Sequence, residues 1–345
     1  MYDTMDLEIV QEEYTTDVEY LVDKKFQWKE RKMGTLKLSE IYSAAGLLRY
    51  AERAKTCATW LQYTLPPEGG DKRLFGANFC QLRLCPLCIA RRAKKAAYRL
   101  SCVLDAVQAG HPDVTYLFLT LTVKNVEGKD LGDTLGQLTK AWDRLCKQRP
   151  VKRAVMGWFR AIEITCKDKG YHPHIHAIVA VEPDYFKRSG GLYITQSDWV
   201  QRWKQALRVD YDPSVRISKT KAKSTGDTMA ASQAAAVEAA KYTTKSDEYI
   251  DDKLGLSEAV QRVTDYTNAL HRRRLTAFGG WLKGAAKKLD MEDVEGGDLV
   301  HLDDGPVRED VAEIIETYHW NFGAGDYILA DREIVSLVVK RKDGE

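Results

Sequence analysis

The stretch YHPHIHAIVA, residues 171–180, places three of the chain's seven histidines at alternate positions and then becomes apolar. Successive side chains of a β-strand point to opposite faces, so His172, His174 and His176 would share one face of a strand. Beyond His176 both faces would be apolar, which predicts that this end of the strand is buried on both sides. Two imidazoles two residues apart on one strand face can bind a single divalent ion.

A carboxylate close to the histidines would complete such a site. WFRAIEIT, residues 158–165, alternates like a strand, and CKDKGY, residues 166–171, contains a glycine and predicts a turn. A hairpin would then lay Glu163 beside the histidine face as a third ligand, with His172 as the alternative. Mixed sites of histidine and carboxylate take manganese or magnesium as well as zinc, iron, copper or nickel. Three partly buried, hydrogen-bonded histidines are the simpler interpretation, but their alternation beside a carboxylate favours a metal site.

The net charge of +2 hides an asymmetry along the 345 residues. Residues 1–23 hold eight acidic side chains and no lysine or arginine, and residues 290–345 hold sixteen acidic and five basic ones. The segment 24–289 therefore carries +21, a charge typical of proteins that bind polyanions. Nucleic acid is the partner that this charge favours over an ordinary solvated surface.

The composition also favours a cytoplasmic protein that does not enter a membrane. No run of 18 apolar residues is present, and the acidic start lacks the basic and apolar regions of a signal peptide. Seven cysteines, several of them closely spaced, favour reduced thiols over a disulfide framework.

Four of these cysteines have the spacing of a structural zinc site. FCQLRLCPLC places Cys80, Cys85 and Cys88 in a C-x4-C-x2-C pattern, and Cys57 on a preceding predicted strand supplies a fourth thiol. If a hairpin brings Cys57 to Cys80, four thiolates can surround one tetrahedral Zn²⁺. The alternative is a set of small, buried hydrophobic side chains.

A basic helix is predicted directly after the cysteines. ARRAKKAAYRLSCVLDAVQ, residues 90–108, is basic at first and then amphipathic. A zinc-braced knuckle followed by such a helix could present cations to phosphates, with a solvated helix face as the simpler alternative. The candidate DNA-binding residues are Arg91, Arg92, Lys94, Lys95 and Arg99.

The order of helices and strands indicates an α+β fold. VTYLFLTLTV, residues 114–123, is the clearest strand, and its continuous hydrophobicity predicts a place in the middle of a sheet. The two strands within 158–180 predict an antiparallel hairpin, which argues against a doubly wound parallel sheet. Further helices are expected over residues 35–55, 131–148 and 197–208, and strand-like segments lie near the C-terminus.

A candidate nucleophile lies on an alanine-rich segment, MAASQAAAVEAAKYTTK, which strongly favours a helix. Glu238, Tyr242 and Lys245 would line one face of that helix. Tyrosine, with a pKa of roughly 10, becomes a useful nucleophile toward a phosphorus that a metal ion polarises. Glu238 could serve as a base for water, and Lys245 could position the phosphate. A lone tyrosine is more typical of core or surface, and whether Tyr249 is a second nucleophile stays open.

The order of these motifs resembles that of the HUH endonucleases. The strand FLTLTV (118–123), the His-hydrophobic-His pattern within HPHIH (172–176) and the Tyr-x-x-Lys of KYTTK follow one another. Together with the spacing of Glu238 and Tyr242 and the cysteine-rich stretch, they look like a rolling-circle plasmid replication initiator (Rep) with a single catalytic tyrosine. The resemblance covers about residues 24–285 and leaves out both ends.

This resemblance implies a central antiparallel sheet of about five strands, flanked by helices, with the histidines on a central strand and the zinc knuckle inserted. Tyr242 would attack a DNA phosphate, leaving a 5′-phosphotyrosine and a free 3′-OH, and Glu238 would activate the water that ends the round. His174, His176 and a third ligand would hold Mg²⁺ or Mn²⁺. The implied partners are plasmid origin DNA, as duplex and as extruded single strand, and the host helicase and replication machinery; a homo-oligomer stays open.

These expectations divide the chain into four regions. They are an acidic N-terminal arm (1–34), a helix and zinc-knuckle region that binds DNA (35–105), an HUH endonuclease core (106–250) and a C-terminal helical region with an acidic, strand-containing tail (251–345).

Three other functions are compatible with parts of the pattern. A mobilisation relaxase of the same superfamily usually carries its tyrosine before the histidine pair, whereas Tyr242 follows it. A cupin-like metalloenzyme that acts on small molecules also uses His-x-His, but it would leave the basic middle segment unexplained. A zinc module that binds DNA without catalysis would explain the charge but not the histidine strand.

Overall fold

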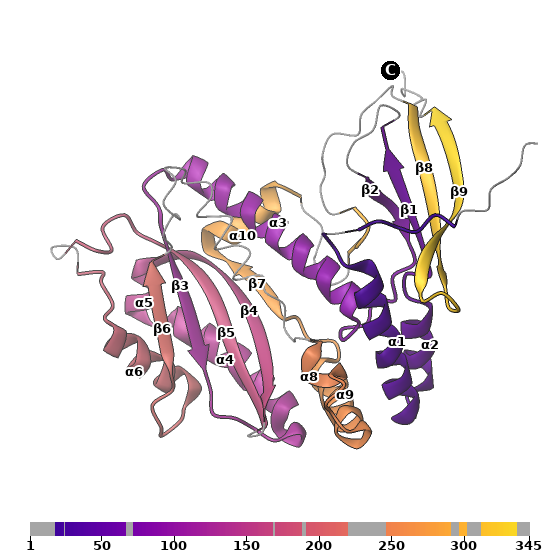
Figure 1. Ribbon diagram of the computed structural model, residues 1–345. Coiled ribbons are helices and arrows are strands. Elements are labelled where there is room, and N and C mark those ends of the chain that lie inside the picture. Colours follow the sequence, from indigo (N-terminus) through magenta and orange to yellow (C-terminus); the bar gives the residue numbers. More distant parts are fainter. Residues whose placement is uncertain are drawn as a thin grey trace, which may run out of the picture.

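Two antiparallel sheets and the helices packed on them make up the part of the chain that the computed structural model describes (Figure 1). The described residues are 18–23, 25–66, 72–167, 170–187, 191–219, 246–290, 297–301 and 312–336. The architecture is α+β, as the sequence predicts. Among these residues, no helix is both long enough and apolar enough to span a membrane.

The first sheet has five strands in the order β6-β3-β5-β4-β7, and each neighbouring pair is antiparallel. The predicted sheet of about five strands is confirmed, with the histidine strand β5 at its centre. The strands are β3 (Thr115–Thr122), β4 (Val155–Lys167), β5 (Gly170–Val181), β6 (Val215–Lys219) and β7 (Thr276–Gly279). Strands β4 and β5 form the predicted hairpin, and Gly170 opens the return strand with a φ of 91°, which suits glycine.

The two faces of this sheet pack against different helices. Leu119 and Ile175 point into the main apolar core, while Phe159 and Ile178 join a smaller core on the opposite face. The main core is covered by α4 (Gly128–Lys147), α5 (Arg149–Ala154), α6 (Gln196–Leu207) and α9 (Leu256–Leu270). The smaller core is covered by α3 (Pro86–Gly110) and α10 (Gly280–Lys288). The end of β5 beyond His176 is therefore buried on both faces, as predicted.

A second sheet, which the sequence did not predict, joins distant parts of the chain. Its strand order is β2-β1-β8-β9, and Leu61 of β1 pairs with Tyr318 of β8. The strands are β1 (Trp60–Leu65), β2 (Arg73–Ala77), β8 (Ala312–Asn321) and β9 (Asp326–Ser336). The predicted regions 35–105 and 251–345 thus share this sheet, which stands apart from the five-stranded one in Figure 1. The division of the chain into four regions stays a prediction.

The N-terminal helix differs from its prediction. The sequence predicts one helix over residues 35–55, whereas the structure has α1 (Trp28–Ala44) and α2 (Leu48–Thr56). Gly46 lies between them with a φ of 72°, a left-handed conformation in which helices commonly end. Residues 1–17 of the predicted acidic arm lie outside the described residues.

Candidate active site and metal centres

The hairpin of β4 and β5 brings a carboxylate to two imidazoles. Glu163 pairs in register with His174, and Ala161 pairs with His176, so the polar side chains stand on one face of the sheet. Their ligand atoms converge, because Glu163 Oε2 lies 3.2 Å from His174 Nε2 and 2.8 Å from His176 Nε2. These three side chains, called here the carboxylate–histidine group, could hold a metal ion.

Contacts on the far side of each ring orient the two imidazoles. His174 Nδ1 lies 3.1 Å from the carbonyl oxygen of His172, and His176 Nδ1 lies 3.2 Å from the hydroxyl of Thr120. A carbonyl oxygen only accepts, so Nδ1 of His174 carries a proton and Nε2 of the neutral ring offers a lone pair. That lone pair faces a carboxylate oxygen, and two acceptors in contact need a proton or a metal ion between them. The donor set suits Mn²⁺ or Mg²⁺ as well as zinc.

His172, the alternative third ligand, stands apart from this group. Its Nδ1 lies 2.8 Å from Oδ1 of Asn125, so the geometry favours Glu163 as the third ligand. Without a metal ion, burial acts to raise the pKa of Glu163, but hydrogen bonds from the protonated rings of His174 and His176, and the positive charge of those rings, outweigh it and lower the pKa to about 2. The carboxylate is therefore ionised at neutral pH, which is the form that binds a metal.

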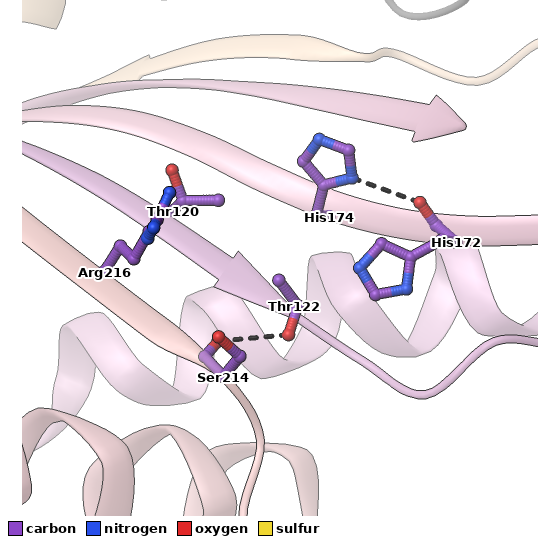
Figure 2. Close-up of a pocket in the computed structure, with 6 residues that line it drawn as sticks. All are labelled: Thr120, Thr122, His172, His174, Ser214 and Arg216. Atoms are coloured by element: carbon purple, nitrogen blue, oxygen red, sulfur yellow. Dashed lines mark hydrogen bonds between the residues drawn. The ribbon is translucent and has the colours of Figure 1, made fainter.

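An open pocket of about 390 Å³ lies beside these histidines (Figure 2). Its lining residues are Thr120, Thr122, His172, His174, Ser214 and Arg216. They come from β3, β5 and β6 and from the residue before β6, so the pocket lies over the sheet between its central strand and one edge. All six are polar or charged and none is a carboxylate, which suits an anionic ligand.

The four cysteines also meet, from three different segments. The Sγ atom of Cys57 lies 3.6 Å from that of Cys85 and 3.7 Å from that of Cys88, and the Sγ atoms of Cys80 and Cys88 are 3.6 Å apart. Cys57 follows the last residue of α2, Cys85 precedes α3 and Cys88 lies in its first turn. This cysteine group could hold a metal ion, in agreement with the predicted zinc knuckle.

A buried lysine accompanies the cysteine group. Lys32 of α1 is fully buried, and its Nζ donates to the carbonyl oxygens of Lys55 and Cys57 at 2.8 and 2.6 Å. Burial lowers the pKa of Lys32 to about 8, against the opposing effect of the nearby thiols. A cation at this place offsets part of the negative charge that four thiolates would bring. The sequence gives no signal for this role, because Lys32 lies in a helix with several other charged residues.

Three of the five candidate DNA-binding residues are buried, which contradicts their predicted exposure. The side chains of Arg91, Arg92 and Lys95 are at most 8% exposed and donate to backbone carbonyls. The carbonyls belong to Gln81, Leu82, Asp298, Leu299 and Val300. These cations therefore fasten neighbouring segments to α3 and do not face solvent. Lys94 is exposed and Arg99 is partly buried, so a role in DNA binding stays a proposal for these two.

The predicted nucleophile is in a part of the chain that the structure does not describe. Tyr242, Glu238 and Lys245 all lie outside the described residues. Tyr249 is described, and it is fully buried with its hydroxyl donating to the carbonyl oxygen of Leu84 at 2.7 Å. A hydroxyl that is buried in the core and hydrogen-bonded to a carbonyl oxygen is poorly placed to act as a second nucleophile.

Known proteins are similar in sequence to most of this chain. The profile of the family Rep_1, "Replication protein", matches residues 71–328. A "Protein rep" of Streptococcus pneumoniae serotype 2 (strain D39 / NCTC 7466) is 39% identical over 284 residues, 81% of this chain and 85% of that protein. A "Protein rep" of Bacillus amyloliquefaciens is 33% identical over 326 residues, 89% of this chain and 94% of that protein. No solved structure matches. The chain belongs to the Rep_1 family of replication proteins, which confirms its resemblance to the rolling-circle plasmid replication initiators.

Proposed function

We propose that this replication protein is an HUH endonuclease of the single-tyrosine type that starts rolling-circle replication by cutting one strand of a plasmid origin. The observation that carries the proposal is the carboxylate–histidine group on the sheet face beside an open pocket. Its partners would be the origin DNA, as duplex and as extruded single strand, and the host helicase and replication machinery in the cytoplasm.

The cutting step would use Tyr242 as the nucleophile. Its hydroxyl oxygen attacks the phosphorus and loses its proton, and the bond from phosphorus to the 3′ oxygen breaks. That oxygen takes up a proton and becomes the free 3′-OH that primes synthesis, while the 5′ phosphate stays on the tyrosine as an ester. Mn²⁺ or Mg²⁺ held by Glu163, His174 and His176 would supply polarisation of the phosphate. Lys245 would offset the negative charge of the phosphate during the attack.

The end of the round would use Glu238. A water molecule that attacks the last phosphate needs a base within hydrogen-bond reach, and a carboxylate one turn from Tyr242 in the helix predicted from the sequence would be suited to that role. Release by water would leave no active phosphotyrosine that could start a new round at once.

The cysteine group would hold a structural Zn²⁺ in this proposal. Cys57, Cys80, Cys85 and Cys88 are four soft sulfur donors whose atoms already approach one another, a ligand set typical of tetrahedral structural zinc. The zinc would brace the loop that precedes α3 and so set the position of the first turn of that helix.

The test is a nicking assay on supercoiled plasmid that carries the origin, with and without Mn²⁺. We expect a nick only with the metal ion, and protein attached to the 5′ end of the cut strand. Tyr242→Phe should fold and bind the origin but neither nick nor form the adduct. A Phe variant that still forms the adduct would contradict the assignment of Tyr242, and a wild-type protein that never nicks would contradict the proposed activity and favour a cupin-like enzyme or a DNA-binding module.

A second assay separates the roles proposed for Tyr242 and Glu238. Glu238→Ala should keep nicking of an initiation oligonucleotide near the wild-type rate and lose hydrolytic release from a termination oligonucleotide, so that covalent protein–DNA species accumulate. Equal effects on both steps, or on neither, would disprove this division of roles. A replication assay then distinguishes an initiator from a mobilisation relaxase.

A further inference from the structure

We infer that Arg216, together with the hydroxyl of Thr120, binds a backbone phosphate of the single-stranded DNA adjacent to the phosphate that is cut. The inference rests on the proposed function and adds a substrate-positioning residue to it. Arg216 lines the side of the pocket that the edge strand β6 forms.

The register of the sheet places Arg216 in line with a metal ligand. Arg216 of β6 pairs with Thr120 of β3, and Thr120 pairs in turn with His176 of β5. Residues paired across neighbouring strands project to the same face, so all three side chains stand on the face of the carboxylate–histidine group. At the usual strand spacing, Arg216 lies about 10 Å across the sheet from the strand of His176. A strand of DNA laid across the β-strands would meet both.

Arg216 is suited to bind a phosphate and is accessible to one. It is exposed on the edge strand and lines the pocket, where Figure 2 shows it beside Thr120. Within the described part of the chain, no hydrogen bond or ion pair engages its guanidinium group. Arginine matches a phosphate with two parallel hydrogen bonds, a geometry that a lysine does not offer.

Thr120 connects this phosphate site to the metal group. Its hydroxyl lies 3.2 Å from Nδ1 of His176, and a ring that presents Nε2 to a metal carries its proton on Nδ1. The hydroxyl then accepts from the ring and keeps its own proton to donate to a phosphate oxygen. Thr122 is differently engaged, because its hydroxyl donates to the carbonyl oxygen of Ser214 at 3.1 Å.

Lys219 provides a matched control on the same strand. It is also exposed, but it lies on the opposite face, where its Nζ is 5.4 Å from the centre of the Phe186 ring. Lys219→Ala removes one positive charge from β6, just as Arg216→Ala does. The two variants therefore differ in the position of the lost charge and share the change in net charge.

The experiment measures binding of a single-stranded oligonucleotide that spans the cut site, in a Tyr242→Phe background that leaves the DNA intact. Each phosphate in turn is replaced by a neutral methylphosphonate. With Arg216 present, the substitution at one phosphate next to the cut should weaken binding about 10-fold. This is the loss in affinity expected when one charge-assisted hydrogen bond is removed. Arg216→Ala should weaken binding of the unmodified oligonucleotide by a similar factor, and the substitution at that phosphate should then have no further effect. The slope of the logarithm of the binding constant against the logarithm of the salt concentration should become shallower by about 0.7. Lys219→Ala should keep the positional effect.

The outcomes separate this inference from the proposed function. If the wild-type protein nicks its origin but Arg216→Ala keeps the same methylphosphonate profile as Lys219→Ala, the inference is wrong and the function stands. If the wild-type protein does not nick, the proposed function fails and the inference falls with it. Arg216→Lys should recover the charge but only part of the affinity, and unchanged thermal unfolding of all three variants shows that folding is intact.

Discussion

The two groups that could hold a metal ion differ in how the protein surrounds them. The cysteine group joins the segment before β1, the loop after β2 and the first turn of α3, three of its four side chains are at most 1% exposed, and Lys32 is buried beside it. The carboxylate–histidine group offers three ligands on a sheet face and borders an open pocket. Structural zinc sites use four protein ligands, whereas catalytic sites leave a position for water or substrate. The first group is thus suited to hold the fold and the second to act on a ligand.

The largest expected effect is on stability, from loss of one cysteine. Cys88→Ser should release the zinc and lower the free energy of unfolding by about 4 kcal/mol or more, because metal binding at such a site contributes directly to folding. Zinc analysis measures the release of the metal ion, and thermal unfolding with and without a chelator measures the loss of stability. The control is Cys102→Ser on the same helix, which lies outside the group and should keep the zinc. Equal stability of the two variants, or carefully purified protein without zinc, would remove the structural role.

Loss of a histidine should lower the nicking rate and leave the stability unchanged. His176→Ala is expected to lower the nicking rate at least about 100-fold, since even changes behind a metal ligand cost 10–100-fold, while zinc content and thermal unfolding stay near wild-type. Affinity for Mn²⁺, followed by its paramagnetic signal, should fall as well. His172→Ala is the matched variant, because His172 lies on the same strand but outside the group, and it should keep the Mn²⁺ affinity. If it loses as much affinity as His176→Ala, the third ligand is His172.

The hairpin at the carboxylate–histidine group could be predicted because its signals are local. Alternation places Glu163, His174 and His176 on one face of their strands, a glycine marks the turn, and a one-residue slip would put the histidines into the apolar core. The second sheet could not be predicted in this way. Leu61 pairs with Tyr318, and short alternating strands carry no signal for a partner so far along the chain.

The basic helix shows a second limit of local patterns. Arg92 and Lys94 look equivalent in the sequence, yet Arg92 is 1% exposed and Lys94 is exposed. The difference depends on which segment packs against each side of α3, in this case the cysteine-rich loop and residues 297–301. Charge indicates a basic segment correctly, but it does not indicate which cations remain at the surface.

A pair of variants on α3 tests this difference and should give an intermediate effect. Arg92→Ala removes hydrogen bonds to the carbonyls of Gln81 and Leu82 and leaves the buried Leu82 acceptor without this donor, so it should cost about 2–3 kcal/mol in denaturant unfolding. Lys94→Ala should change stability by no more than about 0.5 kcal/mol and should lower the salt dependence of DNA binding. If Arg92→Ala leaves stability unchanged, the buried contacts of α3 do not brace the cysteine-rich loop.

The smallest effect is expected at Tyr249, which follows the proposed nucleophile in the sequence and contacts the cysteine-rich loop. Tyr249 lies in the short helix α8 (Asp247–Ile250), a few residues after Tyr242 in the sequence, and its hydroxyl donates to the residue before Cys85. Its ring meets that of Tyr266 edge-on at 5.8 Å. Tyr249→Phe keeps the ring and removes only this hydrogen bond, so the free energy of unfolding should fall by about 1 kcal/mol.

Nicking by Tyr249→Phe should stay near the wild-type rate, because the lost hydroxyl is buried and faces a carbonyl oxygen. Tyr242→Phe should give the reverse, an unchanged stability and no cleavage, although the two substitutions remove the same atom from the same residue type. Denaturant unfolding and the nicking assay on both variants make the comparison. If Tyr249→Phe abolishes cleavage at unchanged stability, the Tyr249 hydroxyl must leave the core during the reaction. Tyr242 would then not be the sole nucleophile, and the two tyrosines would act in turn.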